Sequence, residues 1–393
     1  MEHILKCHEI VKTDFVRGKD CFLYDAQGRR YVDFESGIWC TALGHNHPGI
    51  SRVIKSQLRR VIHLGTRYPN GLVEDAANAV LEIAGMEDGK CVFLVAGSEA
   101  VEFGVQAVRR VTGKPLLLTF ENSFLGSYGS AGTKRPEEWH VLDGNAWDRT
   151  NADEWIARIP FERIGGFAFE PGGSGIGFVR FPPEPLIRRI VREIRGRGGL
   201  ILVNEVTTGM GRTGKWFGFQ HYDLQPDIVA LGKGLGNGYP VSATAMRRET
   251  AGKLELSGFR YAQSHQNDPL GCAVAKEVIS LLREGRWIEK GNAVGGFFLD
   301  ELKQLAQRHP VIKDARGRGM LLGLEFHPHD TITASWAYRA LLEKGFLVGY
   351  YPAANLLRFD PALTMKKDSI RGLIGALDSI LAGAMNASRA ASA

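Results

Sequence analysis

The sequence predicts an α/β protein in which a mainly parallel sheet is flanked by helices. Short apolar runs alternate with helical periodicity through the middle of the chain, and several of these runs end in polar or glycine-rich turns. The expected strands are 91–95, 115–120, 166–169, 200–203, 228–231 and 241–246. Functional groups of open α/β sheets gather beyond the carboxyl ends of strands, so we expect the chemistry of the chain at those turns.

The two ends of the chain predict a second, smaller domain. A length of 393 residues exceeds what one hydrophobic core usually serves. A helical pattern runs from Pro269 to about Leu282, an α+β pattern follows it, and residues 22–34 read as two strands joined by an Asp/Gly turn. We therefore expect a large domain at 46–284 and a small α+β domain formed by both termini, 1–45 and 285–393.

The composition predicts a globular protein without a polyanionic partner. Hydrophobic residues make up 44% of the chain, enough to offset the entropy cost of ordering it. The net charge of +6 is a small imbalance over this length. In the densest basic stretch, 188–195, isoleucines recur at helical spacing and no aromatics are interleaved, so we interpret it as a solvated helix face rather than a nucleic-acid site.

Cysteine and histidine usage gives no pattern typical of a metal site. The five cysteines are scattered and form no C-x-x-C pair. His45 and His47 lack a third ligand and a helix to fix them, so we expect no metal. No segment approaches the ~20 apolar residues of a membrane span, and the amino terminus lacks a signal-peptide pattern. We expect a cytoplasmic protein without a membrane segment.

A lone lysine follows one of the predicted strands. Gly232 and Gly234 flank Lys233, so its backbone can approach a ligand closely, and the apolar run before it would partly desolvate the amine. Desolvation favours the neutral, nucleophilic form of lysine. By spacing alone, a solvated lysine in a flexible loop is an equally good interpretation.

A glycine turn between a predicted strand and helix is a candidate anion site. Gly97 and Ser98 stand at this turn, where the free backbone amides of a helix start can bind an anion. Without other information, the same residues also fit a capped helix start that binds nothing.

The segment from Asn204 to Lys233 closely resembles the class III (ornithine- and acetylornithine-type) aminotransferases. The shared signature is a polar strand end, the G-x-G-R-T-G loop at 209–214 and the downstream lysine. The resemblance extends over almost the whole chain, from the Gly37 region to Arg358. It implies the fold type I of pyridoxal-phosphate (PLP) enzymes, with PLP bound in the large domain as a Schiff base of Lys233.

The same resemblance implies the other cofactor contacts. The turn at Gly97 and Ser98 corresponds to the one that binds the cofactor phosphate in the family. Phe124 matches the aromatic residue that stacks on the pyridine ring, and Val206 would cover the opposite face. Glu170 matches the family's Glu-Pro pair and would support the cofactor site from behind. Taken alone, Phe124 and Val206 are ordinary core residues.

The resemblance also implies a shared active site and a carboxylate contact. Ser264 falls where one subunit of a homodimer hands a hydroxyl to the cofactor phosphate of its partner. Arg358 falls where the family grips the substrate carboxylate, a task suited to a planar guanidinium. Trp39 corresponds to the wall of the substrate pocket and would select substrate size.

The chain departs from the family pattern at three places. Asn204 replaces the acid that pairs with the ring nitrogen, so we expect a weaker electron sink, which Asn204→Asp should strengthen. Thr207 replaces a glutamine. The segment 170–175 carries glycine where some relatives have a glutamate that neutralises a second arginine, which argues against specificity for ornithine-like ω-amines.

The function that follows is amino-group transfer from an amino acid or amine to a 2-oxo acid. Lys233 would carry the cofactor and, within a half-reaction, would move the substrate proton from Cα to C4′ of the cofactor. Two alternatives stay open at this stage: an epimerase or lyase that uses the same cofactor, and a non-catalytic relative that keeps only the fold.

Overall fold

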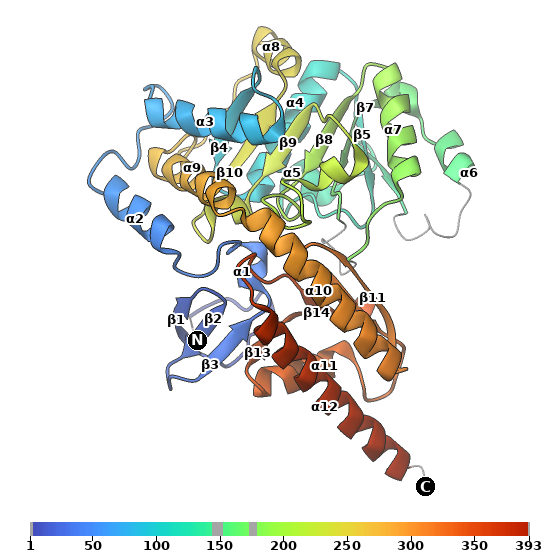
Figure 1. The fold of residues 1–393 in the computed structure, drawn as a ribbon. Coiled ribbons are helices and arrows are strands. Elements are labelled where there is room, and N and C mark those ends of the chain that lie inside the picture. Colours follow the sequence, from blue (N-terminus) through green and yellow to red (C-terminus); the bar gives the residue numbers. More distant parts are fainter. Residues whose placement is uncertain (1–2, 144–151, 173–178, 392–393) are drawn as a thin grey trace.

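A seven-stranded sheet forms the centre of the larger part of the molecule (Figure 1). The computed structural model describes residues 3–143, 152–172 and 179–391. The strand order is β4-β10-β9-β8-β7-β5-β6. All neighbouring pairs from β9 to β6 are parallel, whereas β10 is antiparallel to both β4 and β9. The strands are β4 (Lys90–Leu94), β5 (Leu116–Phe120), β6 (Trp139–Leu142), β7 (Ile164–Phe169), β8 (Leu200–Asn204), β9 (Ile228–Leu231) and β10 (Ser242–Met246).

The predicted α/β class is confirmed, and each of the six expected strands is present within two residues of its expected bounds. The edge strand β6 was not predicted. Its inner positions, His140 and Val141, are half-buried and exposed respectively, so this short strand shows no continuous apolar run. The four strands β5, β7, β9 and β10 are buried at every position, as expected of strands covered on both faces.

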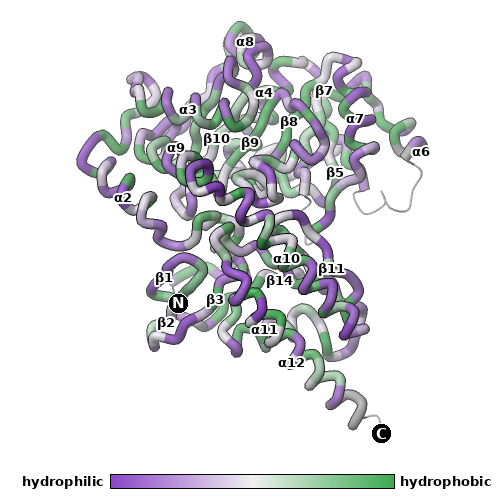
Figure 2. The backbone as a smooth tube through the Cα atoms, viewed as in Figure 1, coloured by the Kyte–Doolittle hydropathy of each residue, from purple (hydrophilic) through white to green (hydrophobic). Residues whose placement is uncertain are grey.

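Helices cover this sheet with their apolar sides (Figure 2). In α4, Val101, Val105 and Val108 are buried at helical spacing. The basic stretch in α7 is a surface helix whose isoleucines are buried, while its Arg188 pairs with Glu184 at 2.7 Å. The helices of this part are α2 (Pro48–Gln57), α3 (Gly71–Ala84), α4 (Gly97–Thr112), α5 (Gly129–Thr133), α6 (Ala152–Ala157), α7 (Glu184–Gly196), α8 (Arg248–Leu256) and α9 (Pro269–Glu284).

The lower part of Figure 1 combines the two ends of the chain. The short strand β13 pairs in parallel with β3, which brings residue 346 opposite residue 32. Two four-stranded sheets lie here, in the orders β1-β2-β3-β13 and β11-β12-β15-β14. Their strands are β1 (Phe15–Lys19), β2 (Phe22–Asp25), β3 (Arg30–Asp33), β11 (Ile312–Arg318), β12 (Leu321–Phe326), β13 (Phe346–Leu347), β14 (Gly349–Tyr351) and β15 (Leu356–Phe359).

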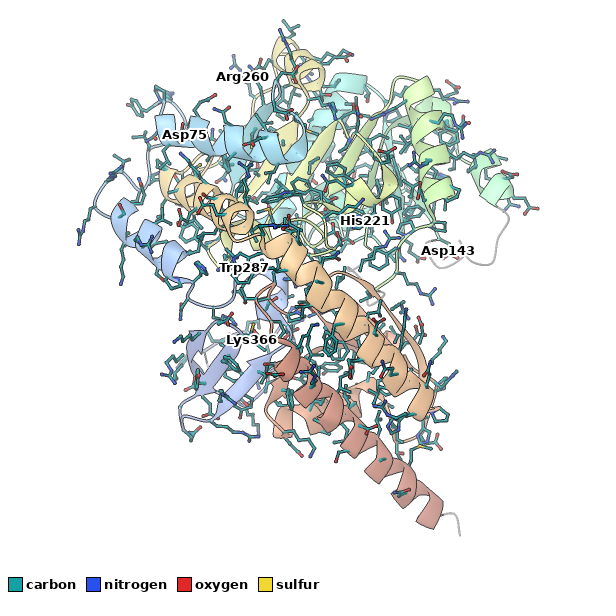
Figure 3. All side chains as sticks on the ribbon, in the orientation of Figure 1. Asp75, Asp143, His221, Arg260, Trp287 and Lys366 are labelled. Carbon is teal, nitrogen blue, oxygen red and sulfur yellow. The ribbon has the colours of Figure 1, made fainter. Side chains whose placement is uncertain are left out.

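Three helices accompany these sheets: α10 (Trp287–Arg308), α11 (Ala334–Glu343) and α12 (Lys367–Ala391). Trp287, the first residue of α10, lies at the level where the two parts of the molecule meet (Figure 3). A short helical segment, α1 (Ser36–Trp39), leads from β3 into the larger part. Within residues 3–143, 152–172 and 179–391, no helix combines the length and apolar character that crossing a bilayer requires.

Candidate active site

A cavity of about 110 Å³ lies beyond the carboxyl ends of β8 and β9, beside the first turn of α4. This is the edge of the sheet at which chemistry was expected. The cavity brings together seven residues singled out in the sequence, which come from four separate segments: Gly97, Ser98, Phe124, Asn204, Val206, Thr207 and Lys233.

Lys233 directly follows β9 and its glycine, and its side chain reaches the cavity. Its Nζ donates a hydrogen bond to Thr207 Oγ1 at 3.2 Å. Burial lowers the pKa of Lys233, although the nearby Glu170 carboxylate acts in the opposite direction. A lowered pKa increases the neutral fraction of the amine, which is the nucleophilic form.

Close backbone packing beneath Lys233 depends on glycine. A Cβ on Gly97 would lie 2.5 Å from Val206 Cγ1, and one on Gly232 would lie 3.3 Å from Gly97 Cα. The loop after β9 and the start of α4 can therefore meet only because neither residue has a side chain.

The first turn of α4 is a candidate anion-binding site. Its amides have no acceptor within the helix, and the helix dipole places partial positive charge at this end. Glu99 accepts hydrogen bonds from the Val95 and Ala96 amides at 2.8 and 3.1 Å, so those two donors are occupied. The helix start is therefore capped, and Gly97 and Ser98 line the cavity, where their amides suit an anion.

The main chain at Phe124 is held from two sides. Its N–H donates to Glu170 Oε2 at 2.7 Å, and its carbonyl accepts from Asn204 Nδ2 at 2.7 Å. Asn204 Oδ1 also accepts from the Val206 N–H at 3.0 Å. Glu170 and Asn204 are buried, whereas 41% of the Phe124 side chain is exposed. The ring therefore projects from a fixed backbone.

Arg358 lies in β15 and is buried, with its guanidinium already bound by other side chains. It donates to Glu35 Oε1 at 2.6 Å, to Asp360 Oδ1 at 2.7 Å and to the Tyr351 hydroxyl at 2.8 Å. The Trp39 ring covers it, with 3.8 Å from Arg358 Cζ to the ring centroid. Lys233 Nζ lies 5.1 Å from the same centroid, so Trp39 connects the arginine to the cavity.

Burial shifts the pKa of both carboxyl groups beside Arg358. It raises the pKa of Asp360 to about 7, although the Arg358 and Arg212 charges counteract the shift. Burial also raises the pKa of Glu35, with Arg358 again opposing it. Sequence reasoning gave no role to Glu35, Tyr351 or Asp360. Asp360 could have been noticed two residues from Arg358, but nothing local indicates the other two.

Trp39 takes its position from a left-handed turn. Ser36, Gly37, Ile38 and Trp39 have φ values of 44°, 59°, 59° and 67°. Residues other than glycine rarely adopt this left-handed backbone conformation, which costs roughly 1–2 kcal/mol per residue. Ser36 Oγ holds the turn by donating to the Asp360 carbonyl at 2.5 Å. Such strain is typical of functional sites.

Ser264 lies outside this cavity, in an exposed loop before α9. Near it, Asp268 hydrogen-bonds the Nδ1 atoms of His63 and His265 at 2.7 and 2.5 Å. This is the only group of three possible metal ligands among the described residues, and its two imidazoles are already hydrogen-bonded to Asp268.

The two histidines considered as ligands in the sequence have structural partners. His45 Nε2 lies 2.7 Å from Asp33 Oδ2, and His47 Nδ1 accepts from the Gly49 N–H at 3.2 Å and so caps α2. Of the glycines in 170–175, considered in place of a glutamate, Gly172 is buried and the two at 173 and 175 lie outside the described residues.

Comparison with known proteins gives one consistent result. Residues 6–136 and 151–381 match the family model described as "Aminotransferase class-III". An acetylornithine aminotransferase from Aquifex aeolicus is 31% identical over 396 residues, covering 97% of this chain and 100% of the relative. One from Listeria innocua is 30% identical, covering 97% and 98%.

Solved structures show the same fold at lower identity. An acetylornithine aminotransferase from Elizabethkingia anophelis has a TM-score of 0.85 at 24% identity and covers 97% of both chains. An S-selective transaminase from an Arthrobacter species has a TM-score of 0.89 at 23% identity, covering 98% of this chain and 97% of its own.

Proposed function

The chain belongs to the class III aminotransferases, which depend on PLP, and from this premise we propose that the cavity at Lys233 is the active site. An aminotransferase moves an amino group from a donor to a 2-oxo acid. Membership of this family does not favour the epimerase, lyase and non-catalytic alternatives. The observation that carries the site proposal is the Lys233 amine, held by Thr207 within a cavity that also contains a helix start.

The residues around the cavity fit PLP. A partly buried amine of lowered pKa suits covalent attachment of an aldehyde, and the Gly97 and Ser98 amides suit a phosphate. Phe124 and Val206 offer two apolar faces for a ring, and Asn204 offers a neutral amide to its nitrogen. When bound, PLP supplies the aldehyde that takes up amino groups and a ring that withdraws electrons from the substrate Cα.

Each residue of the site then has a specific task. Lys233 Nζ would accept the proton from the substrate Cα, and Thr207 Oγ1 orients that Nζ. Trp39 excludes water above Lys233 and limits the size of the substrate. Glu170 supports the Phe124 backbone through its hydrogen bond and influences Lys233 through its charge.

We propose an amino donor that carries a carboxylate and a 2-oxo acid acceptor, with Arg358 as the carboxylate-binding residue. Several relatives are named acetylornithine aminotransferases, so N-acetylornithine is one donor to test, beside α-amino acids, because the glycine in 170–175 argues against specificity for ω-amines. Because Glu35 and Asp360 already pair with Arg358, a substrate carboxylate must compete with at least one of them.

We further propose a homodimer in which Ser264 completes the partner's site. Its support is the exposed position of Ser264 outside its own cavity. Exposed apolar side chains after α2 also favour a subunit contact, with Leu58, Ile62 and Tyr68 exposed at 56%, 43% and 69%.

The five free cysteines fit a cytoplasmic location. The β3–β13 pairing supports the division into domains at 46–284 and at the two termini.

Borohydride reduction of the PLP-loaded protein, followed by peptide mapping, tests the site. The label is expected on Lys233 and should be lost in Lys233→Ala. Lys134 is the matched control, since burial also lowers its pKa but its Nζ donates to the backbone carbonyls of Glu121 and Ser123. Lys134→Ala should keep the label, and finding it on Lys134 or any other lysine would refute the assignment.

A further inference from the structure

Asn204 connects the backbones of two residues that line the cavity. Its Nδ2 donates to the Phe124 carbonyl at 2.7 Å, and its Oδ1 accepts from the Val206 N–H at 3.0 Å. The partners determine the orientation of the amide, because a carbonyl can only accept and a backbone N–H can only donate. Phe124 and Val206 are the residues assigned to the two ring faces in the proposed function, so one side chain ties both faces together.

The connection is rigid on the Phe124 side. Glu170 accepts from the Phe124 N–H at 2.7 Å, so both polar groups of this residue's main chain are held by buried side chains. On the other side, Val206 packs against Gly97 so closely that a Cβ there would lie 2.5 Å from Val206 Cγ1. A shift of either backbone would change the separation of the two ring faces.

We propose that Asn204 is a positioning residue whose neutral amide sets the width of the cofactor slot, and that this task requires a hydrogen-bond donor at position 204. The inference rests on the proposed function for the identity of the ring. It concerns the main chain at Phe124 and Val206, which Asn204 contacts directly.

A carboxylate cannot perform this task at neutral pH. In Asn204→Asp, one carboxylate oxygen would still accept from the Val206 N–H. The other would take the place of Asn204 Nδ2, which lies 2.7 Å from the Phe124 carbonyl oxygen. Two acceptors at that distance repel, and burial makes the lost hydrogen bond costly. A protonated carboxyl group could donate to the carbonyl again. The expectation from the sequence, that Asn204→Asp improves the site, is therefore reversed.

Hydrogen–deuterium exchange on the full chain, with and without PLP, tests this directly. In Asn204→Asp at pH 8, peptides covering 121–127 should exchange faster, while those covering Val206 should be unchanged. Asn204→Ala should speed exchange in both segments and serves as the test if the aspartate variant does not fold. Retention of PLP through gel filtration should fall by about tenfold or more in Asn204→Asp.

The matched control is Asn122→Asp, in the same loop. Asn122 is also buried, but its Nδ2 has no hydrogen-bond partner among the described residues. The substitution therefore adds a buried carboxylate without removing a hydrogen bond that the Asn122 Nδ2 donates. Equal loosening of 121–127 in both aspartate variants would mean that buried charge, rather than the lost contact, is responsible.

The pH dependence gives a second readout. Exchange and PLP retention of Asn204→Asp should recover toward the parent as the pH falls from 8 to 5.5, since the protonated carboxyl group donates. Parent-like exchange and PLP retention at pH 8 in both Asn204 variants would overturn the proposal. Borohydride labelling of the parent separates the two ideas: a labelled Lys233 with unaffected Asn204 variants rejects the positioning role alone, whereas an unlabelled Lys233 rejects the site.

Discussion

Arg358 Nη2 lies 2.6 Å from Glu35 Oε1, so the residue proposed to bind substrate already holds a carboxylate. Glu35 is the more accessible partner, with 32% of its side chain exposed against 0% for Asp360. A substrate carboxylate that reaches Arg358 should therefore displace Glu35 rather than Asp360. Before substrate arrives, Glu35 compensates the charge of the buried guanidinium, which would be costly to leave unpaired.

Glu35→Gln should tighten the binding of carboxylate ligands. The amide can still accept from Arg358, but it no longer competes as an anion, so the Kd of a 2-oxo acid should fall by about 3- to 10-fold. Titration of the holoenzyme with a 2-oxo acid measures this. A simple amine without a carboxylate is the control and should bind as before. Weaker 2-oxo acid binding in Glu35→Gln would mean that Glu35 orients Arg358 instead of competing for it.

Carboxylate binding should also strengthen as the pH falls through the pKa of Asp360, about 7. Ionised Asp360 neutralises Arg358, whereas protonated Asp360 leaves its charge to the ligand. Above pH 7 the Kd of a 2-oxo acid should rise by up to about tenfold per pH unit. Asp360→Asn should flatten the difference between pH 6 and pH 8.5. An unchanged slope in that variant would assign the titration to another group.

The sequence was a good guide to the sheet and to the cavity, and a poor guide to the charges around Arg358. Strands such as β9 are apolar runs that end at a glycine, so local pattern predicts that Lys233 follows a strand, whereas its place among the other cavity residues was implied only by the family resemblance. Glu35 meets Arg358 only because the two ends of the chain pack together, a contact with no local signature. Likewise, the sequence showed that Asn204 departs from the family, but not that its amide bonds the Phe124 carbonyl.

Gly349→Ala should damage the carboxylate site. A Cβ at this position would lie 2.6 Å from Arg358 Cζ, so the guanidinium must move. We expect kcat/KM for a carboxylate donor to fall on the order of 10- to 1000-fold and stability to fall by about 1–3 kcal/mol. Gly375→Ala is the matched control, since nothing lies within 4 Å of its added Cβ. Equal kinetics in both variants would contradict a role for the close approach at Gly349.

Glu205 should make the stability of the fold decrease with pH. Its buried carboxyl group accepts from Thr208 Oγ1 and from the Gly218 and Phe219 amides, and burial raises its pKa to about 7. The folded state therefore binds a proton more tightly than the unfolded state. The resulting stabilisation is complete below about pH 4.5 and is lost as the pH rises through 7.

This loss should amount to at most about 3 kcal/mol and should be absent in Glu205→Gln. Urea unfolding of parent and variant at pH 5 and pH 8 measures it. The free energy of unfolding of the variant, relative to the parent, should rise between these two pH values. A constant difference would show that Glu205 does not titrate in this range.

Mixed dimers test whether Ser264 acts in the partner's site. Lys233→Ala should abolish activity, and Ser264→Ala should weaken PLP retention on the order of tenfold through loss of a hydroxyl contact. In a dimer with one subunit of each variant, a shared arrangement gives one site both defects and the other site neither. Such a dimer, isolated with two affinity tags, should show about half the parent activity and hold PLP tightly on one lysine. If Ser264 serves its own subunit, no site is intact, and the mixed dimer should perform no better than half of the Ser264→Ala homodimer at limiting PLP. A parent protein that sediments as an active monomer would rule out the shared arrangement, because its site needs no partner hydroxyl.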